Sequence, residues 1–162
     1  MGSTSMAEGV SRRGFLTARP APAFRPSPPG AASLSACNGC GDCVRACPQQ
    51  ILLIKDGRVA VDFSRGECTF CNACADACAE PVFTAATMAH HAAIGNACLA
   101  YHGTTCMRCR DACPEDAIRF TPRIGGPFLP HLSSAACTGC GACIAPCPAD
   151  AIAMRPNEAA HA

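Results

Sequence analysis

The chain has 162 residues, of which 49% are apolar, but it has no tryptophan, one tyrosine and seven phenylalanines, so few large side chains are available to fill a core. Its formal net charge of +1 and its single lysine, Lys55, argue against nucleic-acid binding, which needs a basic surface. It contains no apolar run of about 18 residues, so no membrane span is predicted. Cysteine dominates the composition instead, with 16 residues.

Residues 1–34 are predicted to form a disordered tail rich in proline and small residues. Residues 1–35 hold four arginines and one glutamate, a net charge of +3, which leaves −2 for the remainder. The segment 11–17, Ser-Arg-Arg-Gly-Phe-Leu-Thr, resembles the twin-arginine export motif. An export signal also needs an apolar stretch, whereas residues 18–29 contain two arginines and five prolines. We therefore expect no export, and either a solvated basic tail or a short docking element. The docking element would be led by Arg12, Arg13, Phe15 and Leu16.

The cysteines follow the spacing C-x2-C-x2-C-x3-C, by which bacterial ferredoxins hold [4Fe–4S] clusters. Three sets keep this spacing and one set is stretched at its first gap. The sets are Cys37, Cys40, Cys43, Cys47; Cys68, Cys71, Cys74, Cys78; Cys98, Cys106, Cys109, Cys113; and Cys137, Cys140, Cys143, Cys147. Cysteines at such short intervals aim several sulfurs at one point. The pattern therefore favours iron–sulfur clusters over its two alternatives, zinc and a disulfide framework.

The sets recur in pairs, because 31 residues separate Cys37 from Cys68 and again Cys106 from Cys137. This predicts an α+β fold of two tandem bacterial-type two-[4Fe–4S] ferredoxin-like modules with short hairpins and helices. We place the modules at 35–90 and 91–155, and a short disordered tail at 156–162.

Between the cysteine sets, three kinds of element are predicted. Residues 51–62 hold two β-type runs around Asp56-Gly57, a strong hairpin signal. The alanine-rich segment within 79–96 predicts a short helix that ends near Gly95. On such a helix the adjacent His90 and His91 would point in different directions, so we expect a solvated surface and not a metal site. In 113–120 and 147–154 a proline-led turn precedes an apolar strand start.

The ligands are assigned by a rule of two-cluster ferredoxins: the first three cysteines of a set bind one cluster and the fourth binds the other cluster of the module. Four [4Fe–4S] clusters are then predicted, with thiolates as soft ligands for iron. Their ligands are Cys37, Cys40, Cys43 and Cys78; Cys68, Cys71, Cys74 and Cys47; Cys137, Cys140, Cys143 and Cys113; and Cys98, Cys106, Cys109 and Cys147. Because each fourth cysteine crosses over, metal binding is also folding.

Glycines flank the middle cysteine of two sets, at Gly39 and Gly41 and at Gly139 and Gly141, and are expected to let the backbone pass close to inorganic sulfur. The other two sets lack them, so the two clusters of each module should differ in reduction potential. Alternatively, some clusters only stabilise the fold.

The four sets, the twin-arginine-like start at 11–17 and the stretched set from Cys98 to Cys113 together resemble the NapF family, the ferredoxin-type proteins of periplasmic nitrate reductase systems. The resemblance covers residues 11 to about 154. It implies a cytoplasmic accessory protein that binds the precursor form of the catalytic molybdenum subunit before export. There it would help to install its cofactors or keep them reduced.

Two functions remain open on the sequence. A maturation factor would dock a precursor and supply electrons or iron–sulfur units, whereas a soluble electron carrier would run between a reductase or quinol oxidase and a terminal oxidoreductase. The arginine-rich tail favours docking and the repeated sets favour electron transfer; the redox donor is unknown. We do not expect an enzyme, since no catalytic triad order, phosphate loop or flavin fingerprint is found.

Overall fold

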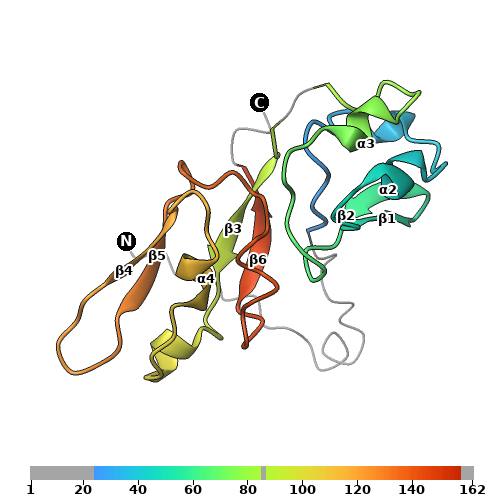
Figure 1. Ribbon diagram of the computed structural model, residues 1–162. Coiled ribbons are helices and arrows are strands. Elements are labelled where there is room, and N and C mark those ends of the chain that lie inside the picture. The colour runs from blue at the N-terminus through green and yellow to red at the C-terminus, as the bar shows by residue number, and fades with distance from the viewer. Residues whose placement is uncertain (1–23, 85–86, 158–162) are drawn as a thin grey trace, which may run out of the picture.

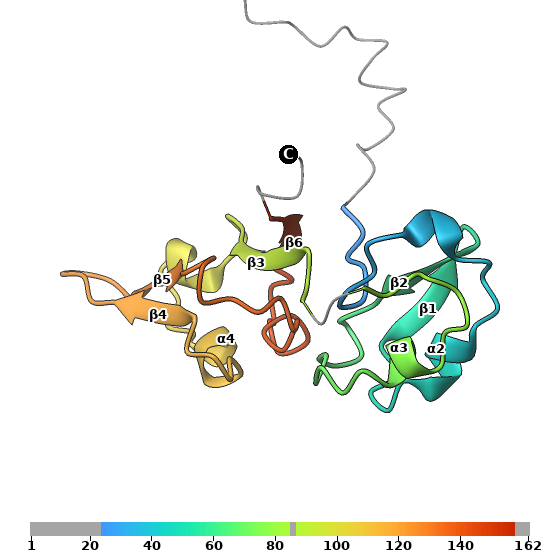
Figure 2. The same cartoon turned by 90° about the horizontal axis from the view of Figure 1, so that it is seen from above.

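The computed structural model describes residues 24–84 and 87–157 (Figure 1). They form two groups of elements that lie side by side, as Figure 2 shows from above. We call residues 24–84 the N-terminal half and residues 87–157 the C-terminal half. The twin-arginine-like segment and the docking element expected around it fall within 1–23, outside the described residues.

The N-terminal half contains a hairpin and short helical turns, namely η1 (Leu34–Ala36), α2 (Asp42–Ala46), β1 (Leu52–Lys55), β2 (Arg58–Val61) and α3 (Ala73–Asp76). β1 pairs antiparallel with β2, and Asp56 and Gly57 form the turn with φ of 51° and 74°. Two successive positive φ values are what a tight hairpin turn requires. The hairpin predicted over 51–62 is therefore confirmed.

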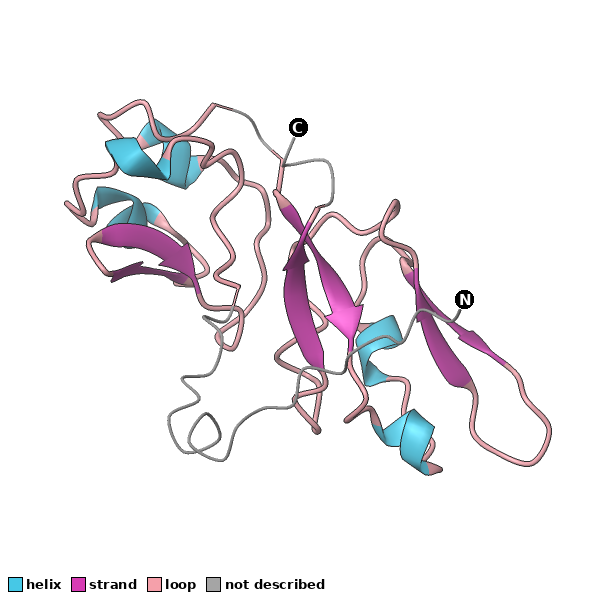
Figure 3. Ribbon diagram, turned by 180° about the vertical axis from the view of Figure 1, so that it is seen from behind, coloured by secondary structure: helices cyan, strands magenta, loops and turns pink. Residues whose placement is uncertain are grey.

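The C-terminal half is built on two antiparallel strand pairs (Figure 3). Its elements are β3 (His90–Ile94), η2 (Leu99–His102), α4 (Arg108–Asp111), β4 (Ile118–Thr121), β5 (Leu129–Leu132) and β6 (Ile152–Pro156). β4 and β5 form a hairpin, whereas β3 pairs with β6 near the other end of the half. Strands β4 and β6 begin just after a Cys-Pro turn, as predicted.

The helix predicted within 79–96 is wrong, because the described residues before position 90 form turns and irregular loop with a bridge at Phe83, and residues 90–94 form strand β3. All five residues of β3 pair with β6, from His90 with Pro156 to Ile94 with Ile152. A short alanine-rich helix is marginal on its own, so pairing with a strand about 60 residues later overrides local propensity. The predicted module boundary after residue 90 falls inside this strand.

Residues 28–31, which are predicted to lie in the disordered tail, are an ordered and packed part of the N-terminal half. The side chain of Pro28 is fully buried, and Ala31 forms an antiparallel bridge with Phe83. The backbone N–H of Gly30 donates to the carbonyl of Thr87 (2.8 Å), and the N–H of Thr84 donates to the carbonyl of Gly30 (2.8 Å). This bridge joins the two ends of the half, as the β3–β6 pair does in the C-terminal half.

The core is one thin cluster that runs through both halves and contains cysteines among its apolar side chains. Its buried members are Cys43, Ile51, Leu52, Val59, Val61, Phe63, Cys74, Met88, Ala92, Ile118, Cys143, Ile152 and Met154. Helices of four or five residues cannot stand without tertiary support, so this cluster and the cysteine loops must hold them. Among the described residues, no helix is long and apolar enough to cross a membrane.

Candidate functional site

The structure gathers the sixteen cysteines around four small cavities, four to each. The first cavity is lined by Cys37, Cys40, Cys43 and Cys78. The second is lined by Cys47, Cys68, Cys71 and Cys74, the third by Cys113, Cys137, Cys140 and Cys143, and the fourth by Cys98, Cys106, Cys109 and Cys147. These are the groupings predicted from the crossing rule. The four cavities are small and similar in size.

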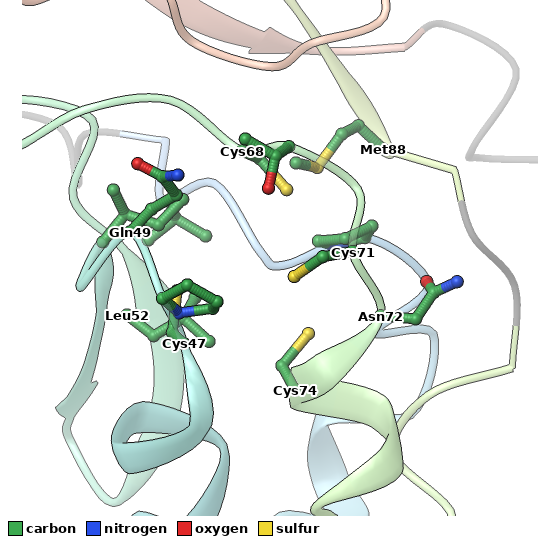
Figure 4. Close-up of a pocket in the computed structure, with 13 residues that line it drawn as sticks. Cys47, Gln49, Leu52, Cys68, Cys71, Asn72, Cys74 and Met88 are labelled. Carbon is green, nitrogen blue, oxygen red and sulfur yellow. The ribbon is translucent and has the colours of Figure 1, made fainter.

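Figure 4 shows the second cavity from close by. Cys68 and Cys71 reach it from the loop that leads into α3 and Cys74 from α3 itself, whereas Cys47 follows directly after α2. Two stretches of chain more than 20 residues apart thus share one cavity. The stretched set makes the same arrangement in the fourth cavity, because η2 accommodates the residues that separate Cys98 from Cys106.

Left-handed residues shape three of the four cysteine loops, and in the first two sets they directly precede a short helix, whereas the third set has Met107 with φ of −132° before α4. Gly39 and Gly41 have φ of 74° and 82°, and Gly139 and Gly141 have φ of 78° and 83°. The second set, which lacks these glycines, keeps the same shape with Phe70 at 54° and Asn72 at 61°. Asparagine tolerates this region, whereas phenylalanine adopts it at a cost of about 1–2 kcal/mol. The second set therefore keeps the backbone form of the loop without the glycines.

A second repeated feature is the turn after each Cys-Pro. Gln50, Asp116 and Asp150 all have positive φ, and each donates its N–H to the carbonyl of the cysteine three residues earlier. This turn directs the fourth cysteine of a set toward the neighbouring cavity and then starts a strand. Cys78 lacks the proline; there Asn38 Nδ2 donates to Glu80 Oε1 (3.2 Å), which ties the loop after Cys78 to the first set.

Burial raises the pKa of six thiols, foremost through loss of solvation. The pKa of Cys74 and that of Cys109 rise to about 11, and the pKa of Cys143 rises to about 12. The pKa values of Cys43, Cys68 and Cys140 are also raised, again chiefly by burial. These thiols hold their protons at neutral pH until a metal competes for the sulfur, so iron binding would release protons.

Backbone amides also point at sulfur. The N–H of Ala151 donates to Cys147 Sγ (3.3 Å), and the N–H of Ala92 donates to Cys137 Sγ (3.5 Å). Hydrogen bonds to ligand sulfur tune the potential of a cluster. The third and fourth cavities thus each have a tuning contact from strand β3 or from the segment before β6.

The prediction that His90 and His91 lie on a solvated surface is wrong for His90. Its side chain is only 1% exposed, and its ring lies against the rings of Phe24 and Phe63, with centroids 6.0 and 5.9 Å away. Burial lowers the pKa of His90 to about 4, so the ring is neutral. His91 is half-buried, and its Nδ1 hydrogen-bonds Asn157 Oδ1 (3.0 Å).

No pattern in the sequence indicated which residues join the two halves. Phe63 lies where a side-chain carbon on Gly141 would be, and the carbonyl of His90 does the same at Gly139. Gly141 thus allows contact between the halves, and Gly139 allows close approach of the β3 backbone within the C-terminal half, in addition to their expected role beside sulfur. No local pattern marks Phe63 or His90 for this, because their partners are distant in sequence.

The donor set fits [4Fe–4S] clusters. All sixteen cysteines are free thiols, which argues against a disulfide framework. Four soft thiolates from two chain segments around one enclosed space match the ligation of an iron–sulfur cluster.

Comparison with known proteins agrees with this chemistry. A family model described as 4Fe-4S dicluster domain matches residues 36–82 and 104–151, one match in each half. The chain is 44% identical over 155 residues to the ferredoxin-type protein NapF of Escherichia coli strain K12, covering 88% of this chain and 93% of that protein. It is 38% identical to the ferredoxin-type protein NapF of Haemophilus influenzae, covering 73% and 69%, and 35% identical to the ferredoxin-type protein NapG of Escherichia coli strain K12, covering 78% and 67%.

Proposed function

The chain belongs to the NapF family of ferredoxin-type proteins, and from this premise we propose that it is an iron–sulfur accessory protein that binds four [4Fe–4S] clusters. Each cluster would be held by the four cysteines of one cavity, so that the two halves act as two-cluster ferredoxin-like modules. When bound, the clusters supply one-electron redox chemistry. The chain itself encloses them, orients their sulfur ligands and directs amides at Cys137 and Cys147.

We further propose that the protein acts in the cytoplasm on the precursor of the catalytic molybdenum subunit of a periplasmic nitrate reductase. It would dock that subunit before export and supply electrons or iron–sulfur units. The observation that carries this proposal is the set of four four-cysteine cavities in a chain with a NapF relative over nearly its whole length.

The second candidate is a soluble electron carrier between a reductase or quinol oxidase and a terminal oxidoreductase. It is favoured by the closeness of thiols from neighbouring cavities. Cys43 of the first cavity helps to raise the pKa of Cys74 in the second, and Cys109 of the fourth helps to raise the pKa of Cys143 in the third. Such closeness suits electron transfer within each half.

The ligand assignment can be tested by counting iron in a double-mutant cycle. If Cys47 and Cys68 share a cavity, Cys47→Ala and Cys68→Ala each remove one cluster, roughly four irons, and the double variant removes no more. The matched pair Cys37→Ala and Cys47→Ala, from one set but two cavities, should remove two clusters together. The reverse pattern of additivity would show that each set binds its own cluster.

The function is tested by anaerobic affinity capture of the holo-protein from the cytoplasm, with partners identified by mass. We expect recovery of the unexported molybdenum subunit, and its loss in the Arg12→Ala/Arg13→Ala double variant. The control is Arg19→Ala/Arg25→Ala, which removes the same charge from the tail outside the motif; Arg25 pairs with Asp56 only at the surface, where an ion pair contributes little. Recovery of a reductase or quinol oxidase alone, unaffected by either double variant, would contradict the docking function and favour a soluble electron carrier.

A further inference from the structure

Among the contacts between the two halves, one set lies directly between the second and third cavities. The backbone N–H of Cys68, which lines the second cavity, donates to the carbonyl oxygen of Cys140, which lines the third (2.8 Å). A hydrogen bond between two ligand loops places the cavities next to each other across the boundary between halves. The Cys140 thiol is also close enough to Cys68 to contribute electrostatically to the raised pKa of that thiol.

Aromatic rings hold this contact in place. His90 of the C-terminal half is enclosed by Phe24 and Phe63 of the N-terminal half, both edge-on to its ring. Phe63 is only 4% exposed and packs on the backbone of Gly141, one residue after Cys140. Such edge-to-face contacts and close packing on glycine leave the two surfaces little freedom to shift relative to each other.

We propose that Phe63, Gly141 and the Cys68–Cys140 hydrogen bond form an inter-half junction that positions the second and third cavities for electron exchange between the halves. Within each half the two cavities are adjacent, because Cys43 and Cys47 of one set line the first and second cavities, and Cys143 and Cys147 of another set line the third and fourth. The junction therefore puts the four cavities in the order first, second, third, fourth. Exchange at the junction moves one electron: the cluster on one side is oxidised by one electron, and the cluster on the other is reduced by one. No proton or leaving group is required.

This inference rests on the proposed redox function, but it concerns how this chain's residues position two cavities, so it can fail while that function holds. Gly141 offers a sharp test, because a methyl group there would overlap the ring of Phe63. The matched control is Gly41, which occupies the same place in the first set. Its φ of 82° equals that of Gly141 (83°) within one degree, and a methyl group there would meet only the end of Arg45, 3.5 Å away. Backbone strain and disturbance of a ligand loop are therefore alike in the two variants.

The experiment uses the full-length holo-protein, prepared anaerobically as wild type, Gly141→Ala and Gly41→Ala, with iron content measured for each. Hydrogen exchange at the Cys68 amide reports the junction itself. Electron paramagnetic resonance of the fully dithionite-reduced protein reports magnetic interaction between reduced clusters. We expect Gly141→Ala to keep its iron, to lose protection of the Cys68 amide and to lose the part of the magnetic interaction that links the halves. We expect Gly41→Ala to retain both signals.

Wild-type protection and wild-type magnetic interaction in iron-replete Gly141→Ala would overturn the proposal. If Gly141→Ala loses iron, Phe63→Leu decides instead, since it trims the junction from the other half without altering a cysteine loop. Loss of the inter-half interaction at full iron content would then support the proposal, and an unchanged interaction would overturn it. Because no partner is present, a negative result here says nothing against capture of the precursor, and failed capture leaves this result intact.

Discussion

The ring of His90 lies in surroundings that a charged imidazole would not tolerate. It is 1% exposed, its two nearest rings belong to Phe24 and Phe63, and its pKa is lowered to about 4 by burial first and by the charge of His91 to a lesser degree. Neither ring nitrogen has a hydrogen-bond partner among the described residues. His90 therefore contributes to folding as a neutral aromatic ring, and its contribution to the free energy of unfolding depends on pH.

We expect His90 to make the protein less stable as the pH falls below its ordinary pKa of 6.5. The folded state keeps the ring neutral down to about pH 4, whereas the unfolded state takes up a proton near pH 6.5. The contribution of His90 to the free energy of unfolding is therefore complete above pH 6.5 and is lost between pH 6.5 and pH 4. The loss should reach about 1–2 kcal/mol near pH 5. The measurement is the guanidinium midpoint for loss of visible absorbance, taken at several pH values under anaerobic conditions.

His90→Phe is the matched variant, because it keeps an aromatic ring and removes the titrating group. General acid lability of clusters affects both proteins equally, so the difference between their pH profiles isolates His90. Parallel profiles for wild type and His90→Phe would show that the ring is accessible to protons in the folded state.

At the scale of elements, what the sequence predicts depends on whether the cause is local. The Asp56-Gly57 turn is predictable because both residues favour the positive φ that the turn needs. Strand β3 is not, since its partner β6 follows about 60 residues later and its own alanines favour a helix. The grouping of cysteines is predictable for the same reason as the turn: spacing fixes three sulfurs, and the crossing of the fourth follows from chemistry shared by two-cluster ferredoxins.

Contacts between elements account for what was missed. The left-handed backbone of the second set at Phe70 and Asn72 carries no glycine signal, and the hairpin turn packs on the first cysteine loop, where a methyl group on Gly39 would meet the carbonyl of Gly57 at 2.9 Å. The hairpin thus supports a ligand loop, although the two are separate patterns in the sequence.

This contact predicts different costs for two glycine substitutions with the same backbone strain. Gly39 and Gly57 both have φ of 74°, so alanine at either position costs about 1–2 kcal/mol of conformational energy. At Gly57 a methyl group would point into open space, whereas at Gly39 it would be pressed against the hairpin carbonyl, which adds roughly another 1 kcal/mol. We expect Gly39→Ala to lower the denaturant midpoint for cluster loss clearly more than Gly57→Ala does. Equal midpoints would mean that the hairpin moves aside for the methyl group at no cost in stability.

At the scale of the whole molecule, the described elements are too small to stand without their clusters. The helices have four or five residues, each sheet has two strands, and three of the buried core residues are the cluster-facing cysteines Cys43, Cys74 and Cys143. Isolated helices of this length and two-stranded sheets are at best marginal in water. As cluster ligands, the crossing cysteines would therefore also be structural connections.

Removing iron with a chelator, with the thiols kept reduced, should consequently unfold most of the protein. The buried thiols of Cys74, Cys109 and Cys143 would regain protons at neutral pH, given pKa values of about 11 to 12, and the four cavities would have nothing to hold their walls apart. We expect the far-ultraviolet circular dichroism to shift to that of an unfolded chain and the amide resonances to lose dispersion. Both should return on reconstitution with iron and sulfide. An iron-free protein that keeps dispersed resonances and unfolds cooperatively would show that the thin apolar cluster, from Ile51 to Met154, suffices to hold both halves, and the cysteines would then serve redox chemistry alone.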